Sequence, residues 1–383
     1  MKFFTLLVSS LATIQMAIAG DPDILSDFIV PANVTTIDAS FFTFTGMRFL
    51  VPATTFKVSK ISLAEFPALN GQSVSYAVLQ FPTGTPNPPH IHPCASELIF
   101  LSQGTLQVGI VDTTNKLFTH TLQKGDVFVF PKGLVHSQYN ADPQEPALAI
   151  PAFGSANAGT VSLPNTLFTT GIDDNVLAKS FKTDFSNSVA SKTVTMKFFS
   201  LLISSFAIIQ MARAGDPDIL SDFIVPANVT TIDASFFTFT GMRFLALTTT
   251  FKVSKISLAE FPALNGQSVS YAVLQFPAGT PNPPHIHPRA SGLLFLIRGT
   301  LQVGTLQIGG IFVFPKGLVH FQYNADPQEP ALAISAFGSA NAGTVSLPNT
   351  LFATGIDNSI LAKSFKTDIA TIQALKAGLA SKP

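Results

Sequence analysis

The sequence predicts an all-β protein built from two similar barrel or sandwich units in tandem. From residue 196 onward the chain repeats its own beginning at a constant offset of 195, with 14 differences between residues 1–109 and 196–304. Within each copy the apolar residues form short runs rich in Val, Phe, Leu and Thr, which is typical of strands. Only 11% of the 383 residues are charged, while 27 Pro and 25 Gly supply turns, so long solvated helices are disfavoured.

The first residues have the pattern of a secretory signal. Lys2 is followed by an apolar stretch from Phe3 to Met16 and by the small-residue pattern Ala17-Ile18-Ala19. The stretch is too short to span a bilayer comfortably, so we expect cleavage and export rather than a membrane anchor. The mature chain should begin near Gly20.

The repeat sets the expected domain limits. The second copy restarts with its own signal-like segment, which has no obvious structural use inside a chain. Two hypotheses stay open: one polypeptide that joins two once-separate coding units, or two units produced separately. We expect the following organisation: a signal peptide at 1–19, a first domain at 20–185, a linker with the internal apolar segment at 186–214, and a second domain at 215–383.

Each unit should fold mainly as strands. In the first copy the predicted strand segments are 73–81, 97–111, 116–123 and 126–131, with a hairpin tip at Thr113–Asn115. The second copy lacks the equivalent of residues 110–120, so it should lose about one hairpin and expose a sheet edge. It ends instead in a stretch with Ile369, Ile372, Leu375 and Leu379 at helical spacing, which predicts a C-terminal helix that the first copy lacks.

Six of the seven histidines fall in one repeated cluster. His90 and His92 are two residues apart, so on a strand they point to the same face. Glu97 follows a turn and could return a carboxylate to that face on the next antiparallel strand, and His136 could come from a distant strand. Three imidazoles and one carboxylate suit Mn, Fe or Zn and leave positions open for substrate. The alternative is a set of ordinary strand-edge histidines, but the combination favours metal ligands.

The spacing of these residues resembles the two sequence boxes of cupins in their germin form. Residues 84–104 match G(x)5HxH(x)4E(x)6G, and residues 125–140 match G(x)5PxGxxHxxxN. The stretches DPDILSDF at 21–28 and NPPHIHP at 87–93 are similar to plant germin-like proteins. The resemblance covers nearly all of each copy.

The resemblance implies two cupin jelly-roll β-barrels in tandem with small C-terminal helical extensions. It also implies secretion to the apoplast, assembly into homo-oligomers that are typically hexamers, and manganese bound by His90, His92, Glu97 and His136. The implied activity is that of a defence oxidoreductase acting on superoxide or, less favoured, on oxalate, with no catalytic residues beyond the metal ligands. Two alternatives are a non-enzymatic cell-wall or storage (nutrient reservoir) protein and a protein that binds a small ligand in the barrel mouth.

Several residues depart from the family pattern. The disulfide that germins usually carry is absent, because Cys94 is the sole cysteine, and we expect its thiol to be buried or inert. Asn87 matches an asparagine that positions oxalate in oxalate-oxidising germins. Ala77 stands where the other such asparagine would be, which argues against that activity.

The second copy departs further at the metal site. It keeps His285, His287 and His320, but Gly292 stands where Glu97 does in the first copy. We therefore expect weak or absent metal binding there.

Two remaining features concern the surface. The acceptor tripeptides at Asn33 and Asn228 predict glycosylation in a secreted chain. The 22 basic and 22 acidic residues cancel, which argues against binding to nucleic acid or to an acidic membrane.

Overall fold

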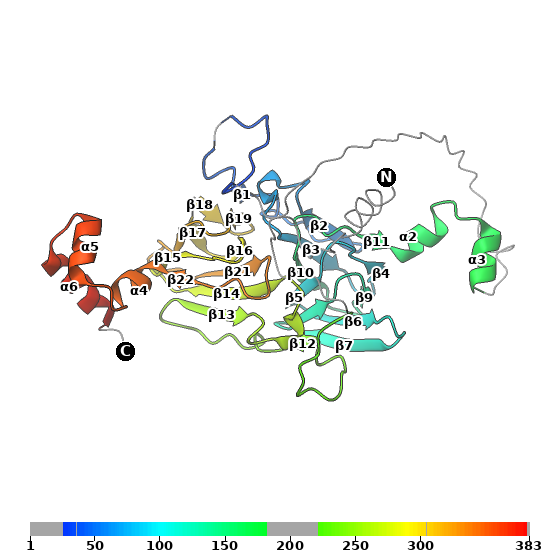
Figure 1. Ribbon diagram of the computed structural model, residues 1–383. Coiled ribbons are helices and arrows are strands. Elements are labelled where there is room, and N and C mark those ends of the chain that lie inside the picture. The colour runs from blue at the N-terminus through cyan, green and yellow to red at the C-terminus, as the bar shows by residue number, and fades with distance from the viewer. Residues whose placement is uncertain (1–25, 36, 182–220, 304, 381–383) are drawn as a thin grey trace, which may run out of the picture.

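The structure, a computed structural model, describes residues 26–35, 37–181, 221–303 and 305–380, and it shows two β-barrels side by side (Figure 1). The all-β class and the two jelly-roll units are therefore confirmed. Both signal-like segments lie outside the described residues. Among the residues described, no helix is long and apolar enough to cross a membrane.

The first barrel consists of two facing antiparallel sheets. One sheet has the order β12-β8-β5-β10-β3-β2, in which β12 (Thr238–Phe239) comes from the second copy, and the other has the order β11-β4-β9-β6-β7. Its strands are β2 (Lys57–Ile61), β3 (Ser75–Phe81), β4 (Pro86–Ile91), β5 (Glu97–Gln103), β6 (Thr105–Val111), β7 (Leu117–Gln123), β8 (Val127–Phe130), β9 (Val135–Tyr139), β10 (Ala147–Phe153) and β11 (Val161–Ser162).

The second barrel repeats this plan with the orders β1-β19-β16-β21-β14-β13 and β18-β17-β20-β15-β22. Its strands are β13 (Lys252–Ile256), β14 (Ser270–Phe276), β15 (Pro281–Ile286), β16 (Gly292–Arg298), β17 (Thr300–Gln302), β18 (Thr305–Gln307), β19 (Ile311–Phe314), β20 (His320–Tyr323), β21 (Ala331–Phe337) and β22 (Val345–Ser346).

The missing residues shorten one hairpin of the second barrel. In the first barrel β6 and β7 pair over seven residues each, and the tip at Thr113–Asn115 is a turn with Asn115 at φ 64°. In the second barrel β17 and β18 have three residues each. Apolar side chains near this gap are exposed, among them Val319 at 60% and Phe321 at 52%. The predicted loss of sheet is thus observed.

Short helices follow each barrel and lie at the two outer ends of the molecule (Figure 1). They are α2 (Leu163–Phe168) and α3 (Asp174–Phe181) after the first barrel, and α4 (Leu347–Phe352), α5 (Asn358–Phe365) and α6 (Ile369–Ala380) after the second, with one-turn 3-10 helices at Pro67–Leu69 and Pro262–Leu264. Helix α6 is the predicted C-terminal helix. Only Ile372 of its predicted apolar positions is fully buried, whereas Ile369 and Leu375 are about half exposed.

The two barrels exchange a short strand near the start of each copy. Strand β1 (Thr43–Phe44) pairs with β19 of the second barrel, and β12 (Thr238–Phe239) pairs with β8 of the first. Each exchanged segment runs over a glycine with positive φ. A Cβ on Gly125 would lie 2.5 Å from the Cα of Arg243, and one on Gly309 would lie 2.5 Å from the Cα of Arg48. Only glycine permits so close a backbone approach.

A continuous apolar core joins the two barrels. One cluster of buried side chains contains residues of both copies, including Tyr76 and Tyr271, whose rings stack at 6.2 Å between centroids. The Tyr271 hydroxyl donates to the carbonyl of Ile150 across the interface at 2.7 Å. Because both barrels contribute to one core and exchange strands, they form a single packed unit.

Candidate metal centre

The first barrel brings together the four predicted ligands. His90 lies in β4, His92 directly follows that strand, and His136 lies in β9 of the same sheet. Their ligand atoms and those of Glu97 all lie within 4.8 Å of one another, and all four side chains are buried. The cluster therefore has the size of a single-ion site.

The predicted path of the carboxylate is wrong. The sequence suggested that Glu97 returns on a strand adjacent to that of His90. However, β4 pairs with β9 and β11, whereas β5, which Glu97 begins, pairs with β8 and β10 in the facing sheet. The carboxylate thus reaches the histidines from across the barrel.

Backbone carbonyls fix the orientation of each imidazole. The Nδ1 atoms of His90, His92 and His136 lie 2.8, 2.5 and 2.8 Å from the carbonyl oxygens of residues 88, 159 and 134. A carbonyl can only accept, so each Nδ1 carries the proton and each Nε2 presents its lone pair to the cluster. Metal-bound histidines in proteins are held in the same way, with the ring N–H that faces away from the metal donated to a protein oxygen or to water.

The electrostatics of the cluster fit a cation. Glu97 Oε2 lies 3.0 Å from His92 Nε2 and 3.2 Å from His136 Nε2. With the proton on Nδ1, these are contacts between acceptors, and a cation among them would turn repulsion into coordination. Burial lowers the pKa of His90 to about 4, so its ring is neutral at pH 7. Burial raises the pKa of Glu97, but the His136 and His92 rings beside the carboxylate, which donate to it only when they are protonated at Nε2, outweigh burial and hold the pKa well below its ordinary value.

A polar network that the sequence analysis missed supports the carboxylate. The side-chain amide of Gln138 reaches Glu97 Oε1 at 3.5 Å, and Asn87 donates to Gln138 Oε1 at 2.7 Å. Gln138 stands two residues after His136 on β9. The alternation of side chains along a strand could therefore have identified it. Asn87, predicted from the resemblance, also lines the cavity.

The cluster opens to a cavity of about 260 Å³. Ala77 and Lys60 line it, and the Lys60 side chain is exposed at its mouth. Phe130 stacks on His136 at 4.5 Å between ring centroids, and Phe153 packs edge-on against His92 at 4.8 Å. Two aromatic rings thus pack against ligand histidines, and Lys60 supplies a positive charge among the described residues that line the cavity.

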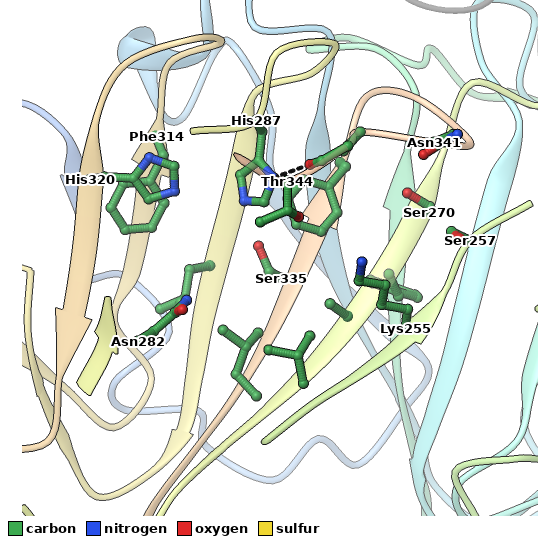
Figure 2. A pocket seen from close by; sticks show the side chains of 18 of the residues that line it. Lys255, Ser257, Ser270, Asn282, His287, Phe314, His320, Ser335, Asn341 and Thr344 are labelled. Carbon is green, nitrogen blue, oxygen red and sulfur yellow. Dashed lines mark hydrogen bonds between the residues drawn. The ribbon is translucent and has the colours of Figure 1, made fainter. Parts of the chain in front are cut away.

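The second barrel preserves the histidines without the acid. His285, His287 and His320 place their ligand atoms within 4.8 Å of one another. Their ring centroids are separated by 4.2 to 5.2 Å, against 4.2 to 5.3 Å in the first barrel. Figure 2 shows this pocket, with His320 on β20 and His287 just beyond the end of the neighbouring strand β15. Burial lowers the pKa of His287 to about 4 and that of His320 to about 3.

Three residues outside the metal sites were also predicted. Cys94 is exposed, so the expectation of a buried thiol is wrong; it lies in the turn between β4 and β5 rather than in the core. Asn33 and Asn228 are both exposed, in turns. Glycosylation at these two positions stays a prediction.

Comparison with known proteins agrees with this architecture. The cupin family model matches residues 51–187 and 248–373. Germin-like protein 9-3 of Oryza sativa subsp. japonica is 57% identical over 183 residues, which cover 45% of this chain and 85% of the relative. Putative germin-like protein 9-2 of the same organism is 53% identical over 196 residues, which cover 48% and 91%.

Solved structures resemble the two-barrel arrangement. The oxalate decarboxylase formate complex of Lactobacillus farciminis has a TM-score of 0.66 at 16% identity and covers 89% of this chain and 97% of its own. At that identity the likeness shows the fold alone. Two cupin matches in one chain, together with germin-like relatives at 53–57% identity over about half of it, lead to one conclusion: the chain belongs to the cupin family and is a tandem duplication of the germin-like unit.

Proposed function

We propose that the first barrel binds manganese and acts as a secreted oxidoreductase on superoxide. The observation that carries the proposal is the buried set of three Nε2 lone pairs and one carboxylate, all within 4.8 Å. This donor set suits a borderline divalent ion and leaves two of six positions open. Bound manganese would supply the one-electron couple that superoxide chemistry needs.

The surrounding residues hold the ligands and admit the substrate. The three backbone carbonyls keep the imidazoles in one tautomer, and Gln138 with Asn87 holds the carboxylate. Phe130 and Phe153 shield the ligands from water. Lys60 at the mouth attracts small anions, because a cation at the entrance of an apolar cavity raises their local concentration.

Superoxide is favoured over oxalate by what lines the cavity. Oxalate carries two carboxylates that need donors on both sides. Here Asn87 donates to Gln138, and Ala77 stands where the resemblance to oxalate-oxidising germins would place the second asparagine. Superoxide is small and needs only access to the open positions.

The test combines metal content and activity of the full-length chain. Elemental mass spectrometry should find about one manganese per polypeptide. Superoxide decay followed by stopped flow should be fast for this protein and for Glu65→Gln, an exposed carboxylate-to-amide control on the same barrel, and slow for Glu97→Gln. Equal decay rates for Glu97→Gln and the parent chain would disprove the oxidoreductase proposal.

A non-enzymatic wall or storage role is the second candidate. Gly292 favours it, because the second copy keeps its barrel core while lacking the acidic ligand. Absence of any transition metal after incubation with Mn(II) would favour this role over the enzymatic one.

We also propose export to the apoplast and assembly into homo-oligomers. The signal-like start of the sequence and the resemblance to germins support export. N-terminal sequencing of the secreted product should begin near Gly20, and intact mass would distinguish one 40.7 kDa chain from separate halves. Light scattering would give the oligomeric state. Because each chain carries two barrels, we expect three chains to form the assembly that six single-barrel chains form in germins.

A further inference from the structure

The second barrel contains a preformed three-histidine cluster without the carboxylate that accompanies the histidines of the first barrel. The Nδ1 atoms of His285, His287 and His320 are bound to backbone carbonyls at 2.8, 2.6 and 2.9 Å. All three Nε2 lone pairs therefore face one space, as in the first barrel. The Nε2 atom of His320 is buried and has no hydrogen-bond partner among the described residues. A buried polar atom in this condition is costly unless something binds it.

The position of the missing acid is bordered by a hydroxyl group. A Cβ on Gly292 would lie 3.3 Å from the Phe337 ring, 3.6 Å from Ser335 Oγ and 3.8 Å from the Phe314 ring. Ser335 occupies the place that Pro151 has in the first copy. The Ser335 hydroxyl donor is therefore present only in the copy that lacks the glutamate. Figure 2 shows Ser335 between His287 and Lys255. A small acid seated here would find a hydrogen-bond donor.

The charge of the cavity also differs from that of the first barrel. Lys255 lines it, as Lys60 lines the first cavity, and no Asp or Glu is among its described lining residues. In the first barrel Glu97 lies among the histidines and supplies an anionic ligand. A divalent ion on the three histidines of the second barrel would meet no carboxylate among the described lining residues, and this favours an added anion as the next ligand.

The shortened hairpin leaves a second, apolar groove beside this cluster. His320 lines the main cavity and also an apolar groove beside the gap, with Val319 and Phe321 at its rim. His136, the counterpart in the first barrel, is 2% exposed, whereas His320 is only half-buried. The main cavity measures about 140 Å³, several times the roughly 30 Å³ that one water occupies in the liquid. The main cavity therefore has room for a small molecule beside the histidines.

We propose that the second barrel is a three-histidine metal site completed by an exogenous monocarboxylate of acetate to propionate size. The side chain of Glu97 in the first copy has the carbon skeleton of propionate, so a carboxylate of this size or one carbon shorter carries the same donor group to the position that Gly292 leaves without one. Ser335 would donate to one carboxylate oxygen while the other meets the metal. Three neutral nitrogens and one exchangeable ligand are the donor set of open zinc-type sites. The proposal is independent of the redox function of the first barrel.

The test uses Co²⁺ as a spectroscopic probe on the full-length chain. His90→Ala with His92→Ala silences the first site; should that double variant fail to fold, the unmodified chain is titrated and the second binding step is followed. Propionate or acetate in a non-coordinating buffer should raise Co²⁺ affinity at the second site at least about tenfold and change its visible spectrum.

Matched variants separate the proposal from its alternatives. Gly292→Glu should bind Co²⁺ tightly without added carboxylate and lose the response to it. His320→Ala should abolish the response, and Ser335→Pro, which restores the residue of the first copy, should weaken it several-fold. Equal Co²⁺ affinity with and without carboxylate, an identical effect of chloride, or a response that survives His320→Ala would each overturn the proposal.

Discussion

The exchanged strand of each copy is anchored by a phenylalanine, and the two anchors should differ in their contribution to stability. Phe237, directly before β12, is fully buried in the first barrel, with ring centroids 5.0 Å from Phe223 and 5.4 Å from Phe118. Phe42 has the equivalent position before β1 but is only half-buried. The reason is local: the counterpart of Phe118 belongs to the hairpin that the second barrel lacks.

Replacement of each anchor by alanine gives a quantitative comparison. Phe237→Ala removes a fully buried ring and should lower the free energy of unfolding by about 3–5 kcal/mol. Phe42→Ala removes a ring that still contacts water, so its cost should be about half of that or less. Urea unfolding of the metal-free full-length chain, followed by circular dichroism, measures both.

A second variant guards against a failure to fold. Phe237→Leu keeps most of the apolar volume and should cost clearly less than the alanine variant. Equal losses for Phe237→Ala and Phe42→Ala, or a larger loss for Phe42→Ala, would refute the idea that the β6–β7 hairpin shields the anchor.

Three further predictions concern the interface and the metal sites. Tyr271→Phe should destabilise the chain by about 1 kcal/mol and Tyr76→Phe by less, in urea unfolding, because their hydroxyls lie 2.7 and 3.4 Å from their carbonyl acceptors. Glu97→Gln should weaken manganese binding at least about tenfold in competition with a chelator, since it removes the anionic ligand. Metal-free protein should lose stability as pH falls from about 6.5 toward 4, because His287 and His320 have lowered pKa values when folded and the unfolded chain takes up more protons; a thermal midpoint that does not fall between pH 7 and 4.5 would contradict this.

Local spacing was sufficient for most of the fold and for bringing the candidate histidines of each copy together. Alternation along short apolar runs identified strands such as β3 and β8, and the i, i+2 rule placed His90 and His92 on one face. The same rule could not place Glu97, because alternation describes one strand and not which sheet the next strand joins. Side-chain alternation along β9 does place Gln138 on the same face as His136. No sequence pattern indicates a role for Lys60, because only the closed barrel brings β2 to the cavity.

The strand exchange lay beyond sequence patterns for a physical reason. β1 and β12 have two residues each, too few to show a period, and their pairing partners are in the other copy. Their stability comes from tertiary contacts, above all the close backbone approach at Gly125 and Gly309. The exposure of Cys94 likewise depends on a turn whose direction the sequence does not encode locally.

The contacts between barrels explain why the second copy can change its site and keep its core. Arg243 of the second copy forms an ion pair with the buried Asp126 of the first, with contacts of 2.5 and 2.7 Å. The reciprocal Arg48 meets Gly310 in place of an aspartate, and its Nε is buried without a partner among the described residues. The first barrel therefore depends on the second for an ion pair, an exchanged strand and the Tyr271 hydrogen bond. These contacts require the shape of the second barrel but no acidic side chain at position 292, where Gly292 leaves room for another ligand.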